Sequence, residues 1–531
     1  MGLNIIQNSN YYLLPQTNVE VDRIEEKRDR NSSIFYLRVR NNSKEKIKIN
    51  SFVVAEFLLP ESYKAVSVLE NNWLQCSEIS YKDVSQSTVK NKIFLQRDQN
   101  PFSFDKDYGY IEESIVSEWF TSINFKEGRN LFKQRSNLFI GAVTTKDQFS
   151  QTFIKKENSG TLVRVTCQFD GLTLSPGQVV KSEKIYFGLG EESENKKIFS
   201  KALAYYMKVK KINDPIKALC CSYYWNGNKI TDEIINNELE TLESFPSKLN
   251  LDYVQLDAGY TKYFGDWLSY DDRFPNGFKE IVKKINNLGY KAGIWLSPFS
   301  INPGTKLHDH HKSWLIRDGY RKHFEGRWTS PFDEISNITD LEVLDPTKLE
   351  VKEYLKKVLT HFKDLGFELF KIDFMYPVCL SSNYSKPVTR AQALREGLEY
   401  IREVLGDDCL ILTGITQLSS VVGIADFVRT GIDSLNPFVS NLPIINKTVN
   451  EYMFESNLKE SENRLFLNGV VWRADPDVLI FNKNLGINKD LIKKQHKFIK
   501  ENNMSMWIGD NVSTLSENSK KKLIQYFNHD S

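Results

Sequence analysis

The segment Leu369-Phe-Lys-Ile-Asp373-Phe-Met-Tyr376 combines an apolar run of strand length with two charged residues that stand two positions apart. It follows an amphipathic segment of helix length at about 347–364. The same succession repeats after Lys217, where strand-length apolar runs alternate with helix-length segments. This alternation predicts eight strands, at about residues 218–224, 253–257, 291–297, 368–373, 410–414, 426–430, 478–482 and 505–508.

Eight strand units in about 310 residues, with helices in most of the gaps, are typical of a (β/α)₈ TIM barrel with insertions. A doubly wound parallel sheet is the structural alternative. A dinucleotide-binding version of that sheet would carry a glycine-rich phosphate-binding fingerprint after its first strand, and none follows the first strand here. We therefore expect the α/β barrel.

The chain before the barrel reads as antiparallel β structure. Residues 35–40, 47–54 and 163–169 alternate between apolar and polar side chains, and turn residues separate such runs. This pattern favours a β-sandwich. We expect an N-terminal β-sandwich domain over 1–195, a linker helix over 196–215 and the catalytic barrel over 216–531.

Composition is that of a soluble globular protein, with 531 residues, 40% hydrophobic residues, 26% charged residues and a net charge of +2. This balance gives no reason to expect a nucleic acid or an anionic membrane as a partner. The N-terminus lacks a basic start followed by an apolar run, and no apolar run reaches bilayer length, so we expect a cytoplasmic protein. The six cysteines form no Cys-x-x-Cys pair and are expected to be free thiols.

Charged residues stand where the expected strands end, which in a barrel of this kind is where catalysis takes place. Lys371 and Asp373 are two positions apart, so both point to the same side of the sheet, and the lysine favours an ionised, nucleophilic carboxylate. A buried structural ion pair is the equally simple alternative. Asp433 follows the sixth strand, whereas Asp426 precedes it and is expected to be structural. Two carboxylates at one barrel mouth are what glycosidic cleavage requires.

Further side chains near these strand ends suit a sugar ligand. Asp257 ends the second strand and can accept hydrogen bonds from hydroxyl groups, and Trp295 ends the third. Trp267 and Trp314 lie in the connections that follow these strands. An indole is more often plain core, but three of them near one mouth favour a sugar-binding cleft.

Taken in order, these strings resemble the α-galactosidase and melibiase family of glycoside hydrolases, which also holds α-N-acetylgalactosaminidases and raffinose synthases. The resemblance covers about residues 215–510 and rests on an ordered set of short motifs. They are Cys221-Ser-Tyr-Tyr-Trp, Leu256-Asp-Ala-Gly-Tyr, Gly265-Asp-Trp-Leu, Phe274-Pro-Asn-Gly-Phe, Gly293-Ile-Trp-Leu-Ser-Pro-Phe, Leu344-Asp-Pro-Thr, Lys371-Ile-Asp-Phe, Arg429-Thr-Gly-Ile-Asp433 and Asp475-Pro-Asp-Val.

The resemblance implies a retaining hydrolase that cleaves terminal α-galactosides by double displacement, with an oligosaccharide or another glycoside as substrate. Asp373 matches the family's nucleophile and Asp433 its acid/base. Asp257, Trp295, Lys371 and Arg429 match positions that contact the sugar, and we add Trp267 to this set from its place near the mouth. The formation of a homo-oligomer stays open.

The chain departs from the family's pattern at three places. Members usually carry two adjacent acids after the second strand, where this chain has Asp257 and Ala258. Many carry a Cys-Gly or Gly-Cys-Gly sequence after the fifth strand, where this chain has Thr413-Gly-Ile-Thr416. The family's usual C-terminal β-domain is also expected to be missing. The first two departures leave the accepted sugar open.

Two other readings therefore stand beside the hydrolysis of α-galactosides. One is the same chemistry on a related α-glycoside, such as an α-N-acetylgalactosaminide, or transfer of galactose to a sugar acceptor in the manner of raffinose synthases. The other is a non-catalytic carbohydrate-binding protein. We expect no metal or other cofactor, because the nearest candidate ligands, His308, His310, His311 and His323, share one polar insertion rather than strand ends.

Overall fold

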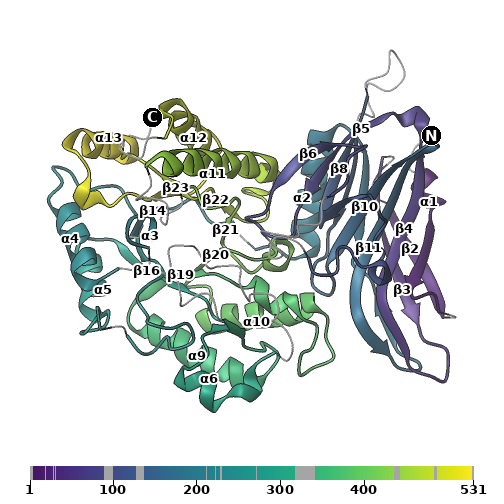
Figure 1. Cartoon of the computed structure of the whole chain (residues 1–531), viewed down its shortest axis with the longest axis horizontal. Helices are drawn as coiled ribbons and strands as arrows, with labels where there is room; N and C mark the ends of the chain where they lie inside the picture. Colours follow the sequence, from purple (N-terminus) through teal and green to yellow (C-terminus); the bar gives the residue numbers. More distant parts are fainter. Residues whose placement is uncertain are drawn as a thin grey trace. The chain divides into compact units, whose positions relative to one another are not determined.

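The structure is a computed structural model of the chain (Figure 1). It describes residues 4–17, 19–27, 29, 31–88, 100–126, 137–210, 212–221, 223–227, 230–270, 272–316, 341–435, 443–482 and 487–528. The chain forms two compact units. Unit 1 comprises Met1–Lys211, Cys379–Arg395 and Gln417–Gly423, and unit 2 comprises Ile212–Val378, Glu396–Thr416 and Ile424–Ser531.

Unit 1 contains two antiparallel sheets, as predicted from the alternating runs. Rings from both sheets meet in the core, where Phe57 and Phe187 lie 6.4 Å apart between centroids. The first sheet has the order β1 (Asn10–Leu14), β4 (Ile47–Pro60), β11 (Gly160–Leu174), β10 (Ser150–Glu157) and β7 (Ile115–Glu118). The second has the order β12 (Val179–Lys181), β3 (Ser32–Arg40), β13 (Ile185–Gly190), β9 (Asn137–Ala142), β8 (Phe120–Phe125), β5 (Ala65–Asn71) and β6 (Ile79–Asp83), with β2 (Glu20–Lys27) paired to β3.

Helix α2 (Glu192–Tyr206) occupies much of the expected linker and packs on the second sheet. Phe199 on α2 contacts Phe139 on β9, with ring centroids 5.0 Å apart. A Cβ atom at Gly141 would stand 2.6 Å from the Phe199 ring, so this close approach requires glycine. The helix is therefore part of unit 1, while the predicted domain boundaries at 195 and 216 remain a prediction.

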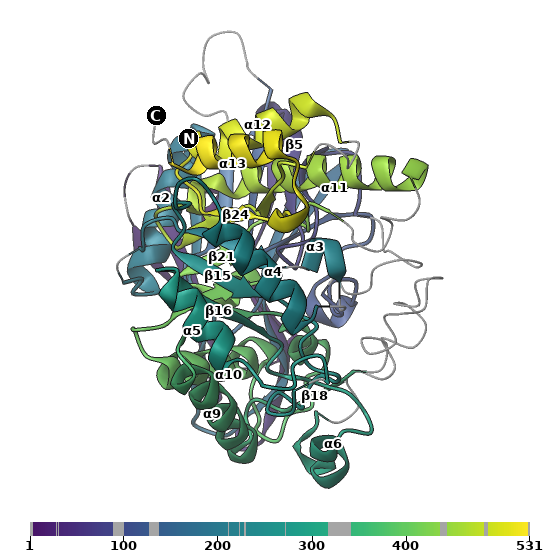
Figure 2. The same cartoon turned by 90° about the vertical axis from the view of Figure 1, so that its left-hand side faces the viewer.

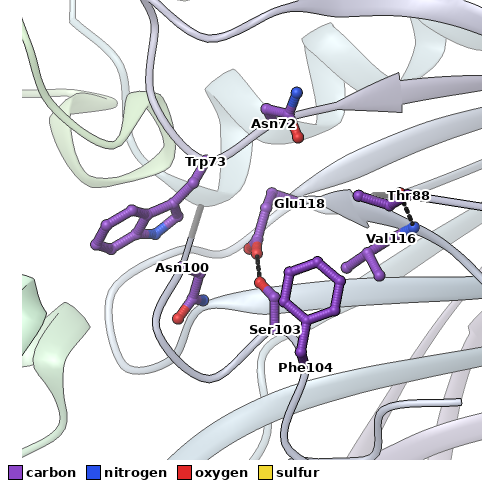
Figure 3. Close-up of a pocket in the computed structure, with 8 residues that line it drawn as sticks. All are labelled: Asn72, Trp73, Thr88, Asn100, Ser103, Phe104, Val116 and Glu118. Atoms are coloured by element: carbon purple, nitrogen blue, oxygen red, sulfur yellow. Dashed lines mark hydrogen bonds between the residues drawn. The ribbon is translucent and has the colours of Figure 1, made fainter. Parts of the chain in front are cut away.

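A small polar pocket lies in unit 1 beside Glu118 (Figure 3). The Glu118 carboxylate is 6% exposed and accepts a hydrogen bond of 2.9 Å from Ser103 Oγ and another from Gln151. Burial raises the pKa of Glu118 to about 7, although the side-chain hydrogen bonds oppose this. The indole nitrogen of Trp73, which also lines the pocket, is buried without a hydrogen-bond partner. The pocket thus offers both the oxygen atoms of Glu118 and the N–H of Trp73, which suits an ordered water molecule.

Unit 2 is the predicted barrel of parallel strands (Figures 1 and 2). The ladder runs β14 (Lys217–Cys221), β15 (Tyr253–Leu256), β16 (Lys291–Leu296), β19 (Phe367–Ile372), β20 (Leu410–Thr413), β21 (Phe427–Arg429) and β22 (Arg473–Asp475), and on the other side of β14 it continues through β24 (Met506–Ile508) to β23 (Val478–Leu479). The helices include α3 (Tyr223–Asn226), α4 (Asp232–Glu243), α5 (Lys279–Asn287), α6 (Lys306–His310), α9 (Leu349–Asp364), α10 (Arg390–Leu405), α11 (Pro443–Arg464), α12 (Lys489–Glu501) and α13 (Glu517–Asn528).

Helix α9 shows why these segments cover the barrel. Its buried side chains, Val351, Leu355, Val358, Leu359 and Phe362, recur every three or four residues and form one apolar face. Helix α4 begins at Thr231, whose hydroxyl accepts a hydrogen bond from the backbone N–H of Ile234. Figure 2 looks onto the side of unit 2 that α4 and α5 cover. Among the described residues, none of the helices combines the length and apolar character needed to cross a bilayer.

Two predicted strands need correction. The first was expected over 218–224, but β14 ends at Cys221 and helix α3 begins at Tyr223. The seventh strand differs more. Its expected position was 478–482, but the strand is split into β22, which pairs with β21, and β23, which pairs with β24. Pro476 separates the two pieces and has no N–H for the ladder, and Asp477 has a φ of 71° in the left-handed region. Strand pairing therefore begins at Arg473, five residues earlier than expected, and Asp475 and Asp477 belong to the strand and its break.

Candidate active site

The ion pair between Lys371 and Asp257 lies inside the barrel. Lys371 Nζ is 2.8 Å from Asp257 Oδ2, and the two residues are 8% and 2% exposed. Gln255 Nε2 also donates to Asp257 Oδ2 at 3.1 Å, and the backbone N–H of Ala258 donates to Oδ1 at 2.8 Å. Burial opposes ionisation of Asp257, but the Lys371 charge and these donors outweigh it and lower its pKa. Asp257 is therefore held as a carboxylate.

Asp373 follows β19 and is 8% exposed. Its Oδ2 accepts a hydrogen bond of 3.1 Å from Trp295 Nε1, and its Oδ1 accepts one of 2.8 Å from the backbone N–H of Phe374. A Cβ atom at Gly414, which follows β20, would stand 2.6 Å from Asp373 Oδ1. Glycine at this position therefore leaves the space that the carboxylate occupies, and two N–H donors hold the carboxylate in place.

Trp295 and Trp267 differ in what they contact. Trp295 contacts Asp373 directly, whereas Trp267 is 0% exposed and packs against Trp295 with ring centroids 5.9 Å apart. Phe264 contacts both indoles, at 5.6 Å and 5.5 Å. Both indoles are thus buried, Trp295 being 2% exposed, and they differ in that Trp295 binds Asp373 while Trp267 packs against Trp295. The sugar contact of Trp267 stays a prediction. Trp314 is stacked on His311, 3.9 Å away.

Arg429, at the end of β21, is surrounded by three carboxylates. Its Nε lies 2.9 Å from Asp475 Oδ2, its Nη2 lies 2.7 Å from Asp477 Oδ1, and its Nη1 lies 2.9 Å from Asp433 Oδ1. Burial opposes the charge of the guanidinium, but the surrounding carboxylates raise the pKa of Arg429 well above its usual value. Asp475 and Asp477 are 0% exposed, whereas the Asp433 side chain is 42% exposed.

The segment that carries Asp433 is fixed by helix α11. Glu460 on α11 accepts a hydrogen bond of 2.7 Å from the backbone N–H of Ile432, and Asn457 donates to the carbonyl of the same residue. Arg464 Nη1 donates to the Thr430 carbonyl at 2.7 Å. Loss of hydration and the repulsion of the Asp477 and Asp373 carboxylates raise the pKa of Asp433 to about 6, against the attraction of Arg429 and Lys371. Asp433 can therefore carry a proton near neutral pH.

Tyr224 and Asp477 were missed in the sequence analysis. The Tyr224 hydroxyl donates to Asp477 Oδ1 at 2.6 Å and lies 3.4 Å from Asp433 Oδ1. Both residues stand in motifs quoted above, Cys221-Ser-Tyr-Tyr-Trp and Asp475-Pro-Asp-Val. Placing the seventh strand at 478–482 put Asp477 before that strand, at the end of the barrel opposite the mouth. Pro476 was the signal that could have revealed the role of Asp477, because a proline there indicates that the strand begins earlier and breaks at this position.

Three of the four histidines of the polar insertion, His308, His310 and His311, lie in the part of the chain that the structure describes. Within the described ranges, no group of three or more His, Cys, Asp or Glu side chains is arranged to hold a metal ion. His308 contacts Glu342 at 2.8 Å and Asp309 at 3.0 Å, between the short strands β17 (Ser300–Ile301) and β18 (Glu342–Val343). His323 belongs to 317–340, which lie outside the described residues.

Comparison with known proteins shows a similarity to α-galactosidases in part of the sequence and in the fold. Residues 236–374 match the Melibiase family model. Over 88 residues the chain is 30% identical to α-galactosidase AgaA of Geobacillus stearothermophilus, a match that covers 15% of this chain and 12% of that protein. Over 113 residues it is 29% identical to α-galactosidase C of Emericella nidulans, covering 18% of this chain and 15% of that protein. The matched stretches thus span less than a sixth of these curated relatives.

The similarity of fold extends over nearly the whole chain. The structure of the α-galactosidase TtGalA of Thermus thermophilus, in complex with p-nitrophenyl α-D-galactopyranoside, covers 96% of this chain and 95% of its own, with a TM-score of 0.68 and 17% identity. That of AgaA covers 96% of this chain and 67% of its own, with a TM-score of 0.63 and 14% identity. These comparisons confirm that the chain resembles the α-galactosidase and melibiase family, in its sequence over residues 236–374 and in its fold throughout.

Proposed function

We propose that the chain is a retaining glycoside hydrolase that removes terminal α-galactosyl groups, with Asp373 as nucleophile and Asp433 as acid/base. The observation that carries the proposal is the different environment of these two carboxylates. Asp373 is 8% exposed and accepts hydrogen bonds from Trp295 Nε1 and from the backbone N–H of Phe374, whereas the Asp433 side chain is 42% exposed and its pKa is raised to about 6. A nucleophilic carboxylate together with a carboxylic acid that can donate a proton is the arrangement that glycosidic cleavage needs.

In the first step, the Asp373 carboxylate attacks the anomeric carbon while the bond from that carbon to the leaving oxygen breaks. Asp433 gives its proton to this oxygen, which departs as an alcohol. In the second step, Asp433 takes a proton from a water molecule, whose oxygen attacks the anomeric carbon and releases Asp373. The two inversions restore the α configuration.

The remaining residues are assigned to binding and positioning. Asp257 and Lys371 form an ion pair whose oxygen and nitrogen atoms suit hydroxyl groups of a sugar, and Trp295 holds Asp373. Arg429, whose guanidinium faces carboxylates, holds Asp433, and Trp267 supports Trp295. Structures of TtGalA with stachyose and of AgaA variants with raffinose and stachyose support an α-galactosyl oligosaccharide as substrate.

A related α-glycoside, such as an α-N-acetylgalactosaminide, is the second candidate, and transfer to a sugar acceptor is its variant. Two observations favour it. Ala258 stands where the family's pattern has a second acid, and it offers only its backbone N–H, which binds Asp257. After β20 the chain has Gly414 and Ile415, and the contact of Gly414 with Asp373 leaves no space for a side chain at this position.

We also propose a cytoplasmic location. Five cysteines whose side chains the structure describes are free, and four of them are buried: the free ones are Cys76, Cys167, Cys220, Cys379 and Cys409. Free thiols are typical of a reducing compartment.

A panel of aryl α-glycosides tests the proposal. We expect nitrophenol release from the α-galactoside or the α-N-acetylgalactosaminide, and proton NMR should show the α anomer of the sugar as the first product. The β anomer as first product would refute the retaining mechanism. Sugar binding without release from any member of the panel would favour the non-catalytic alternative.

A further inference from the structure

The environment of Arg429 holds more negative than positive charge. One guanidinium contacts three carboxylates, of Asp433, Asp475 and Asp477, at 2.7–2.9 Å. If all three were ionised, the group would carry two uncompensated negative charges, two of its carboxylates being fully buried. Such a cluster relieves the repulsion by holding a proton on one member.

Hydrogen-bond donors distinguish the three carboxylates. Asp477 accepts from Arg429, from Tyr224 Oη at 2.6 Å and from the backbone N–H of Ser434 at 2.6 Å. Asp475 accepts from Arg429 and from the backbone N–H of Asp477 at 2.8 Å. Asp433 has Arg429 at 2.9 Å and a longer contact of 3.4 Å to Tyr224. The two buried carboxylates therefore have more close donors than Asp433, and Asp433 is the member that takes the proton.

We infer that Asp477 is a positioning residue that keeps the proton on Asp433, by offsetting the charge of Arg429 and by drawing the Tyr224 hydroxyl to itself. This inference rests on the proposed acid/base role of Asp433. An arginine beside a carboxylic acid would otherwise promote ionisation of that acid and remove the proton that the leaving group needs. With Asp477 in place, Asp433 can contact Arg429 and still keep the proton that acid catalysis needs.

The other charged groups that face Asp433 do not replace Asp477. Lys371 favours ionisation of Asp433 and Asp373 disfavours it, so these two groups act in opposite directions. Glu460 on α11 accepts from the backbone N–H of Ile432, the residue next to Asp433. After burial, Asp477 is the largest cause of the raised pKa of Asp433. Burial and the carboxylates of Asp433 and Asp477 raise the pKa of Tyr224, so its hydroxyl stays a donor.

Asp477→Asn tests the inference, because asparagine keeps the size of the side chain and removes its charge. With the repulsion gone, the pKa of Asp433 should fall by about one unit or more. The alkaline limb of kcat/KM for a substrate with a poor leaving group, such as an α-galactosyl disaccharide, should move to lower pH by the same amount. The matched control is Asp475→Asn, which removes another negative charge beside the Arg429 guanidinium. It should shift the alkaline limb less.

Tyr224→Phe provides a second variant, in which the charge of Asp477 stays in place. Loss of a hydroxyl donor near Asp433 disfavours its anion, so its pKa should stay the same or rise slightly. A general loosening of the site would move both variants in the same direction. If Asp477→Asn does not fold, Tyr224→Phe decides, because a clear fall in the pKa of Asp433 would then contradict the inference.

Carbon-13 NMR of labelled aspartate carboxyls, compared with Asp433→Asn, measures the Asp433 pKa without turnover. A lower pKa in Asp477→Asn supports the inference, and an unchanged or higher pKa overturns it. Because this measurement needs no substrate, failure of the proposed function shows separately, as titration of Asp433 near pH 6 in a protein that cleaves none of the aryl glycosides.

Discussion

Two buried arginines, one in each unit, make a direct comparison. In unit 1, Arg390 is 0% exposed, and its Nε lies 3.1 Å from the single carboxylate of Asp170. Its remaining partners are neutral, with Nη1 donating to Asn100 Oδ1 at 2.8 Å and the Phe102 ring 4.2 Å from its Cζ. In unit 2, Arg429 faces three carboxylates, and one of these, Asp433, is 42% exposed. The charge of Arg390 is balanced by one carboxylate, whereas Arg429 contacts three carboxylates with a single positive charge.

The difference shows that a buried ion pair is not by itself a sign of chemistry. Arg390 and Asp170 neutralise each other, and both side chains of this pair are buried. Around Arg429 the excess of carboxylates leaves Asp433 as an accessible acid with a pKa of about 6. Unmatched charge, combined with exposure of one member, sets the Arg429 cluster apart from the pair of Arg390 and Asp170. The proposed function assigns the chemistry to the first of these.

The largest effect is expected for Asp373→Ala. Turnover should fall by roughly 10⁴-fold or more, because no other carboxylate can attack the anomeric carbon. Azide should partly restore turnover and give the β-glycosyl azide, because the small anion fits the vacated space. Near-normal activity in this variant, measured on an accepted aryl glycoside, would mean that Asp373 has a structural role.

Asp433→Ala should separate substrates by their leaving groups. For poor leaving groups we expect kcat/KM to fall about 10²- to 10⁴-fold, and for activated aryl glycosides much less, since only the former need a proton in the first step. Asp426→Ala is the control on the same strand. Asp426 binds Arg402, and it accepts hydrogen bonds of 2.7 Å and 2.8 Å from the Ile411 backbone and from Asn213. Asp426→Ala should lower the free energy of unfolding, but it should not separate substrates by their leaving groups. Equal losses across leaving groups would make Asp433 structural.

Arg390→Met should affect stability rather than chemistry. It leaves the buried Asp170 carboxylate without its cation, which costs about 3–5 kcal/mol in the free energy of unfolding. The double variant with Asp170→Asn should recover part of this loss in a denaturant titration. Folded protein should keep kcat within a few-fold. A loss below about 1 kcal/mol would show that charge matching contributes little in unit 1.

Ala258→Asp should have a smaller effect, on specificity. A restored charge-assisted hydrogen bond to the sugar is expected to stabilise the transition state by about 1.5–3 kcal/mol, which raises kcat/KM on aryl α-galactoside roughly tenfold to a hundredfold. Ala258→Asn matches the size without the charge and should gain less. If the unmodified protein already reaches about 10⁵ M⁻¹s⁻¹ on this substrate, Ala258 does not limit galactoside cleavage.

The order of the strands was predictable because local hydrophobic patterns specify it. The predicted strands fall on barrel strands, and Asp257, Trp295, Lys371, Asp373, Arg429 and Asp433 all lie at or just after their C-terminal ends. Spacing alone also placed Lys371 and Asp373 on one side of β19. Their catalytic and binding roles remain predictions that the variants above test.

Other features depend on contacts between distant parts of the chain. Tyr224 and Asp477 are 253 residues apart and meet only because β14 and the broken seventh strand flank β24 in the closed barrel. The packing of Trp267 against Trp295 could not be predicted either, because spacing does not show which indoles meet in space. The contact of Gly414 with Asp373 likewise depends on the register of β19 and β20.

Trapping the covalent intermediate tests the central claim most directly. A 5-fluoro-α-galactosyl fluoride carries a good leaving group and slows the second step, so the glycosyl-enzyme should accumulate and its peptide can be identified by mass spectrometry. We predict one added fluorogalactosyl group, on the peptide that contains Asp373, and no such label in Asp373→Ala. A label on Asp433 or Asp257, or turnover of this substrate and of the aryl α-galactoside with release of the β anomer, would contradict the assignment.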